Sequence, residues 1–189
     1  VDRRVLIPRP ETELLVELAL EVQPASVLDV GTGSGAIALA VAGELSGATV
    51  LATDIYPEAL EVARWNAQAL ELTGRVAFQS GSLPGAGSFD LLLANLPYVS
   101  AREWLSLEPE LREFEPRGAL VPGHTGLEAF EALLGELSVS PLRIAAIGLE
   151  VGRGQAPLVA ELVRRAGFER TEVRPDLAGI ERVVAGWRS

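Results

Sequence analysis

The stretch that decides the fold is Asp29-Val30-Gly31-Thr32-Gly33-Ser34-Gly35-Ala36, which joins a short apolar run (26–30) to a helical pattern (36–45). Glycines allow a backbone to pass close to a ligand, and the N-terminus of the following helix presents free N–H groups to it. Asp54 ends the next apolar run, 23 residues after Gly31. A carboxylate there can accept hydrogen bonds from both hydroxyls of a ribose. The pattern predicts a nucleoside cofactor, with a tight strand–helix turn that binds nothing as the alternative.

Outward from this stretch, apolar runs alternate with amphipathic ones along the whole chain. Alternation of this kind predicts an α/β fold with a mostly parallel sheet covered on both faces. The last two runs are joined by a short turn and predict one antiparallel edge. Strands are expected at 26–30, 49–53, 75–79, 89–94, 142–151, 169–174 and 182–187, and helices at 11–21, 36–45, 57–72, 126–137 and 156–166. Residues 95–123 are rich in Pro and Glu, and a long segment of this kind inside a compact domain is usually functional.

Composition limits the function classes. The 189 residues are 48% hydrophobic, which is enough for one well-buried domain. The formal net charge is −10 and no basic stripe is present, which makes a nucleic-acid partner unlikely. No apolar run reaches the roughly 18 residues of a membrane span, and cysteine is absent, so disulfides and thiolate metal sites are excluded. We expect a cytoplasmic protein, and the start at Val1 without Met suggests a fragment of a longer chain.

A second motif, Asn95-Leu96-Pro97-Tyr98, directly follows the apolar run 89–94. Proline removes a donor from a sheet, and Asn favours turns. The same residues suit a slot for a flat, amide-bearing group, because Asn supplies an acceptor and donors and Tyr supplies a π-face. A strand-ending turn with a half-buried Tyr is the alternative for these four residues.

Both motifs resemble those of known enzymes. Asp29-x-Gly31-x-Gly33-x-Gly35 resembles motif I of class I S-adenosylmethionine (SAM) methyltransferases, although Gly31-x-Gly33-x-x-Ala36 also satisfies the looser NAD fingerprint. Asn95-Leu96-Pro97-Tyr98 resembles the (Asn/Asp)-Pro-Pro-(Tyr/Phe) motif of the amino methyltransferases that act on DNA, RNA or protein glutamine. The segment Leu6-Ile7-Pro8-Arg9-Pro10-Glu11-Thr12-Glu13 looks like the signature of the protein glutamine-N5 methyltransferases. The segments 114–120, 126–128, 148–152 and 181–184 are similar to the rest of that catalytic domain.

This resemblance implies a Rossmann-like, seven-stranded class I methyltransferase fold. It implies SAM as cofactor, S-adenosylhomocysteine as product and no metal. The signature segment points to the enzymes that methylate a peptide chain release factor. Residues 1–189 would then be a single catalytic domain, a monomer, with the family's helical N-terminal substrate-binding domain missing before Val1. The alternatives are a ribosomal-protein glutamine methyltransferase, an adenine-N6 nucleic-acid methyltransferase, an inactive nucleoside-binding module and an NAD-dependent oxidoreductase.

The resemblance also assigns roles to residues. We expect the Asn95 side-chain oxygen and the Leu96 carbonyl to accept the two N–H bonds of the acceptor amide, with Tyr98 stacked on it and Pro97 in the same slot. The expected cofactor contacts are Asp29, Gly31, Thr32, Gly33, Ser34, Gly35, Asp54, Ile55, Gly81, Ser82 and Asn95. Two departures matter: Leu96 replaces a proline of the motif, and Ser80-Gly81-Ser82 offers no carboxylate near the adenine. Arg9, Glu11 and Glu13 are either solvated charges at a helix start or part of a closure over the cofactor.

Overall fold

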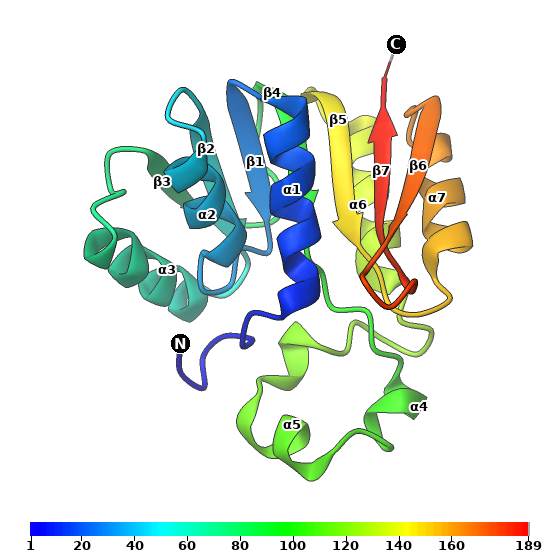
Figure 1. Cartoon of the computed structure of the whole chain (residues 1–189). Helices are drawn as coiled ribbons and strands as arrows, with labels where there is room; N and C mark the ends of the chain where they lie inside the picture. Colours follow the sequence, from blue (N-terminus) through cyan, green and yellow to red (C-terminus); the bar gives the residue numbers. More distant parts are fainter. Residues whose placement is uncertain (189) are drawn as a thin grey trace.

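The fold is a seven-stranded sheet with helices on both faces (Figure 1), seen in a computed structural model that describes residues 1–188. The strand order is β3-β2-β1-β4-β5-β7-β6. Six strands run in the same direction, and β7 runs opposite to them, between β5 and β6. The strands are β1 Ser26–Val30, β2 Thr49–Asp54, β3 Val76–Ser80, β4 Ser88–Ala94, β5 Arg143–Glu150, β6 Arg170–Pro175 and β7 Glu181–Trp187. The predicted α/β fold with an antiparallel edge is confirmed.

The two faces of the sheet bury alternate residues of the central strands. Leu91 and Leu93 of β4 pack under the helices of one face, and Leu92 and Ala94 pack under those of the other. The first face carries α1 (Glu13–Val22) and α2 (Ala36–Glu44), with α3 (Pro57–Ala69) alongside β2 and β3. The second face carries α6 (Glu128–Val139) and α7 (Ala156–Arg165). A parallel sheet covered in this way explains why its strands read as nearly continuous apolar runs.

Two helices begin later than the sequence pattern predicts. Pro10–Thr12 form a single 3-10 turn, so that α1 starts at Glu13. Gly126 has a φ of +84°, which is incompatible with a helix, and the carboxylate of Glu128 accepts hydrogen bonds from the Thr125 and Gly126 N–H groups. The helical ladder of α6 therefore starts at Glu128.

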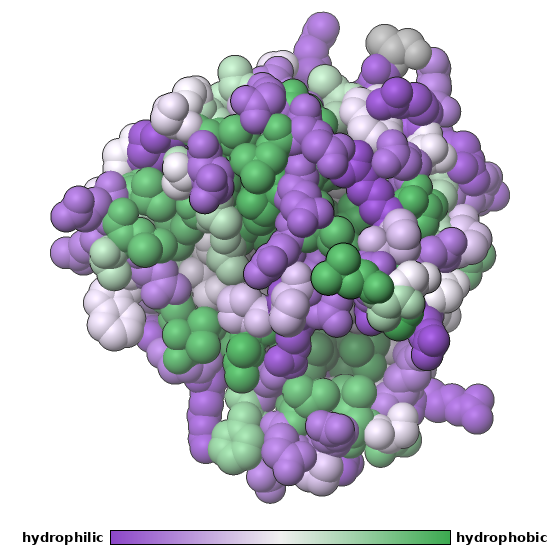
Figure 2. Space-filling view, in the orientation of Figure 1, coloured by the Kyte–Doolittle hydropathy of each residue, from purple (hydrophilic) through white to green (hydrophobic). Residues whose placement is uncertain are grey.

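The segment 95–123 contains only short helices, as expected: α4 (Ala101–Trp104), α5 (Pro109–Phe114) and a 3-10 turn at Arg117–Ala119. Figure 1 shows this segment and the N-terminus below the carboxyl ends of the parallel strands. Figure 2 shows apolar surface in the same lower part of the view, and the exposed apolar side chains of this segment include Leu105 and Phe114. None of the helices within residues 1–188 is long and apolar enough to cross a membrane.

Candidate active site

The two sequence motifs meet at the point where the strand order reverses. β1 and β4 are neighbours in the sheet, with Val30 opposite Ala94, so the glycine loop after β1 lies beside the Asn95–Tyr98 motif after β4. In open α/β sheets, ligands bind in the crevice outside the carboxyl ends of the strands at this switch point. The position of the candidate site thus follows from the topology.

The glycine loop needs its glycines for backbone conformation. Gly31, Gly33 and Gly35 have φ angles of +72°, +56° and +83°. These angles lie in the left-handed region, which residues other than glycine rarely adopt. The N–H groups of Gly31 and Thr32 both donate to the Thr53 carbonyl at 2.9 Å, which ties the loop to the end of β2. A Cβ at Gly33 would meet no atom within 4 Å, so this part of the backbone is open to a ligand.

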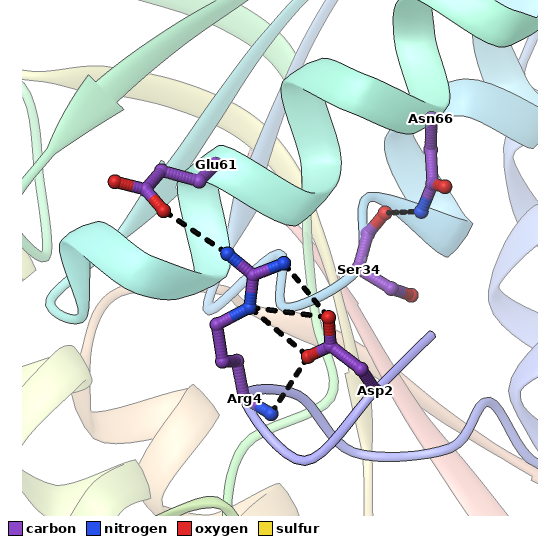
Figure 3. A network of polar contacts seen from close by, with 5 residues as sticks. All are labelled: Asp2, Arg4, Ser34, Glu61 and Asn66. Carbon is purple, nitrogen blue, oxygen red and sulfur yellow. Dashed lines mark hydrogen bonds and ion pairs between the residues drawn. The ribbon is translucent and has the colours of Figure 1, made fainter.

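Two polar contacts around the loop are visible in Figure 3. Asn66 of α3 donates from its side-chain nitrogen to the Ser34 carbonyl at 2.8 Å, which fixes the loop against the helix. Nearby, Arg4 forms ion pairs with Asp2 at 2.7 Å and with Glu61 of α3 at 3.0 Å. The ion pair between Arg4 and Glu61 holds the N-terminal segment against α3 at the edge of the crevice.

Asp54 lies where a ribose acceptor is expected. Its two carboxylate oxygens accept from the Gly33 and Tyr56 N–H groups, each at 2.9 Å, and the side chain lines the cavity described below. Burial raises the pKa of Asp54, and the backbone hydrogen bonds oppose this rise. Because a carboxylate oxygen can accept more than one hydrogen bond, both oxygens keep acceptor capacity for hydroxyl groups.

Asp29 is fully buried beneath the loop. Its Oδ2 accepts from the Thr32 hydroxyl at 2.6 Å and from the Ala38 N–H at 3.2 Å, whereas Oδ1 has no hydrogen-bond partner among the described residues. Burial raises the pKa of Asp29 to about 7, and the negative charge of Asp54 adds to this effect. Asp29 therefore supports the loop, and its Oδ1 is one of the buried side-chain atoms without a partner within residues 1–188.

A cavity of about 650 Å³ opens between these elements, within the usual size range of small-molecule sites. All the expected cofactor contacts line it except two: Asp29 is buried beneath the loop, and Gly35 packs against Leu39 and Ala63. The N-terminal segment adds a wall that the sequence pattern only partly suggested, formed by Arg4, Val5, Leu6, Pro8 and Thr12.

Helix α6 supplies a further wall that we did not predict. Its cavity-lining residues are Ala129, Ala132, Leu133 and Glu136. Their spacing of three, four and seven residues marks one stripe of a helix. This spacing was a readable signal, but the neighbouring core stripe with Phe130 and Leu134 is more apolar and hides it.

The Asn95–Tyr98 motif keeps the side-chain oxygen of Asn95 available. The Asn95 side-chain nitrogen donates to the Thr12 hydroxyl at 3.0 Å, which leaves the Asn95 Oδ1 for another donor. Asn95, Leu96 and Pro97 line the cavity. The Leu96 side chain is 8% exposed and packs over Gly31, whose added Cβ would lie 3.3 Å from it. Packing thus anchors the backbone of Leu96, where the resembled motif has a proline ring.

Tyr98 is placed differently from the other three residues of its motif, because it is not among the residues that line the cavity. Its hydroxyl donates to the Glu150 carboxylate at 3.3 Å, and its carbonyl accepts from the Gln155 side chain at 2.9 Å. Burial and the negative charge of Glu150 raise the pKa of Tyr98. The stacking of Tyr98 on an acceptor amide stays a prediction.

The segment 95–123 and the N-terminal segment meet across the mouth of the cavity. Arg9 forms an ion pair with the buried Glu115, and the hydroxyl of Tyr56 lies against Gly118, where any side chain would overlap it. Glu11 faces Arg182 at 3.9 Å instead. Of the charges before α1, Arg9 therefore joins the N-terminal segment to residues 95–123, and Glu11 belongs to a different ion pair; a closure over the cofactor stays a prediction.

Comparisons with known proteins identify relatives along nearly the whole chain. Residues 10–108 match the family described as Methyltransferase small domain. The chain is 42% identical, over 98% of its length and 67% of the relative's, to a release factor glutamine methyltransferase from Cereibacter sphaeroides. It is 44% identical to the protein of the same name from Bordetella pertussis, over 97% of this chain and 70% of that one. The chain thus spans about two thirds of the length of these relatives.

Solved structures share the fold at low identity. A methyltransferase from Pyrococcus furiosus superposes with a TM-score of 0.73 at 17% identity, covering 100% of this chain and 87% of that one. The N-terminal domain of human METTL16 in complex with SAH superposes with a TM-score of 0.67 at 17% identity, covering 97% of this chain and 72% of that one. These likenesses establish the fold as that of class I SAM-dependent methyltransferases.

Proposed function

The chain belongs to the family of release factor glutamine methyltransferases, and we propose that it transfers a methyl group from SAM to the side-chain nitrogen (N5) of a glutamine in a peptide chain release factor. The observation that carries this proposal is the meeting of two sites across β1 and β4. A nucleoside-binding loop ends one strand, and two free oxygen acceptors, Asn95 Oδ1 and the Leu96 carbonyl, follow the other.

The residues around the glycine loop suit SAM. The open backbone at Gly33 accepts a close ligand, and Asp54 retains acceptor capacity toward the cavity for the ribose hydroxyls. Gly81 and Ser82 line the same cavity after β3, where the adenine is expected. When bound, SAM supplies an electrophilic methyl group on a sulfonium. We propose all eleven cofactor contacts named from the sequence for this role, with Asp29 and Gly35 shaping the loop without lining the cavity.

An amide nitrogen is a poor nucleophile, because its lone pair is delocalised into the carbonyl. Holding it in a reactive orientation against the methyl group can be worth roughly 7–11 kcal/mol. Asn95 Oδ1 and the Leu96 carbonyl each accept one N–H bond of the glutamine, which turns its lone pair toward the sulfonium. With SAM bound, the nitrogen would gain the methyl group as the carbon–sulfur bond breaks, which would release S-adenosylhomocysteine. The methylated nitrogen would then lose one of its two protons to solvent. Tyr98 and Pro97 border the glutamine amide.

We extend the proposal to the setting of the enzyme. The chain acts as a single catalytic domain and as a monomer, in the cytoplasm, where its partner takes part in translation. The absence of cysteine suits a cytoplasmic protein. The net charge of −10 supports a protein substrate over a nucleic acid. A glutamine on an exposed loop of the partner suits a cavity that must admit a whole side chain.

The test is transfer of label from methyl-labelled SAM to purified release factor, followed by mass mapping of the methylated residue. We expect one methyl group on one glutamine, and at least a 100-fold loss of rate in Asn95→Ala, because aligned acceptors supply most of the orientation. Duplex DNA and ribosomal protein serve as competing acceptors. Full activity of Asn95→Ala, or methylation of DNA that weakens steeply with salt, would overturn the proposal.

A further inference from the structure

A chain of hydrogen bonds behind the cavity ends on Asn95. The Thr12 hydroxyl donates to Glu150 Oε2 at 2.6 Å and accepts from the Asn95 side-chain nitrogen at 3.0 Å. The Tyr98 hydroxyl donates to the other oxygen, Oε1 of Glu150, at 3.3 Å. Thr12 is 7% exposed and Glu150 is 1% exposed, so the bond between these two side chains is shielded from water.

The direction of each bond in this chain follows from the one before it. An ionised carboxylate only accepts, so both hydroxyls must point their hydrogens at Glu150. Because the hydroxyl of Thr12 donates its only hydrogen to Glu150, it can act only as an acceptor toward Asn95. The amide of Asn95 is the group that can satisfy this demand, by turning its nitrogen toward Thr12 and its oxygen away, into the cavity.

We propose that Thr12 and Glu150 are positioning residues that fix the side-chain amide of Asn95 with its oxygen facing the acceptor glutamine. This inference rests on the proposed function and deepens it. Without the constraint, the amide of Asn95 can rotate by half a turn and present its own N–H groups to those of the substrate. Two donors would then face each other, and the glutamine nitrogen would lose one of its two acceptors.

The ion pairs around the chain are consistent with this role. Burial raises the pKa of Glu150, whereas the hydrogen bonds from Thr12 and Tyr98 oppose this rise. The positive charge of Arg182, which is itself paired with Asp176 at 2.9 Å, also opposes it. Glu11 acts in the opposite direction on Glu150. Thr12 lies in the signature segment and Glu150 at the end of β5, and they are separated by 138 positions in the sequence. The orientation of Asn95 therefore depends on three separate parts of the chain.

The first test is kinetic and uses Thr12→Val, which keeps the shape of the side chain and removes its hydroxyl. We expect kcat with release factor to fall about 30- to 100-fold, while the Kd for SAM stays within threefold. Thr12→Ser keeps the hydroxyl and should recover activity to within about threefold of the parent. Cooperative unfolding shows whether Thr12→Val is folded. If it is not folded, Thr12→Ala, which removes the same hydroxyl, is used in its place.

The second test needs no methyl acceptor. The chain contains only two asparagines, Asn66 and Asn95, so protein labelled with ¹⁵N-asparagine shows two side-chain NH₂ pairs. The pair that disappears in Asn95→Ala belongs to Asn95. We expect its hydrogen exchange to be slow in the parent and in Thr12→Ser, and fast in Thr12→Val. The pair of Asn66, which donates to the Ser34 carbonyl, should be unchanged and serves as the internal reference.

The outcomes separate the inference from the proposed function. If the parent methylates release factor and Thr12→Val is equally fast, or if exchange at Asn95 is the same in both, the positioning role is refuted. If the parent methylates no release factor, the proposed function fails, while the exchange measurement still decides whether Thr12 holds Asn95.

Discussion

Replacing Asp54 by asparagine gives the sharpest test of the cofactor site. Both oxygens of the carboxylate already accept backbone N–H bonds at 2.9 Å, from Gly33 on one side and Tyr56 on the other. An asparagine must place its NH₂ group against one of these donors, and it offers a single neutral acceptor to the ribose. The loss of one hydrogen bond to a charged acceptor costs about 1.5–3 kcal/mol. The Kd for SAM should therefore rise about 10- to 150-fold.

The assay is calorimetric titration of SAM into the purified protein, with Asp90→Asn as the matched control. Asp90 also accepts backbone N–H bonds, from Ala25 and Ser26 at 2.9 Å, but at the opposite end of the sheet. Its substitution removes the same charge and should leave the Kd within about twofold of the parent. A change of less than threefold in Asp54→Asn, or an equal loss in both variants, would refute the argument for a ribose acceptor at Asp54.

Three other substitutions give further predictions. Asp29→Asn removes a buried charge and keeps both bonds to Oδ2. The carboxyl titrates near 3.8 when unfolded and near 7 when folded, so the stability of the parent falls as the pH rises between these values. In urea unfolding without cofactor, the advantage of the variant should grow from about pH 5 to about pH 8, and an advantage independent of pH would contradict the assignment. Gly31→Ala should lower the free energy of unfolding by about 1–2 kcal/mol through strain at its φ of +72°, whereas Gly135→Ala on the exposed side of α6 should raise it by about 0.5–1 kcal/mol; equal effects would exclude strain at Gly31. Leu96→Ala should cost about 2–3 kcal/mol, because its side chain is 8% exposed, and thermal unfolding with an unchanged midpoint would show that packing does not anchor the motif.

The sheet and the main motifs could be predicted because their signals are local. Apolar runs mark the strands, the three alternate glycines permit a left-handed backbone, and Asp54 directly ends a strand. The meeting of the glycine loop with Asn95 also follows, because parallel strands bring their carboxyl ends to one edge of a sheet.

The contacts of Thr12 with Glu150 could not be predicted, since nothing in either neighbourhood reveals a partner 138 positions away. The same holds for the ion pair of Arg9 with Glu115, which joins two irregular segments. Irregular segments carry no periodicity from which their packing could be read. The departure of Tyr98 from the cavity wall has a similar cause, because its hydroxyl is drawn to a buried carboxylate on β5.

The pairing of β1 with β4 fixes the spacing between the glycine loop and the Asn95–Tyr98 motif, whereas other segments form the wall that a substrate would contact. Adjacent strands lie about 4.8 Å apart whatever loops follow them, so the spacing between donor loop and acceptor motif is set by the sheet ladder, with Asp29 opposite Leu93 and Val30 opposite Ala94. One outer wall of the site, by contrast, comes from the turns of residues 99–123, where Pro116, Gly118 and Ala119 line the cavity. We therefore expect that changes in the sequence of this wall alter which protein segment can enter the site. The distance between the glycine loop and the Asn95–Tyr98 motif, which the β1–β4 ladder sets, should not change.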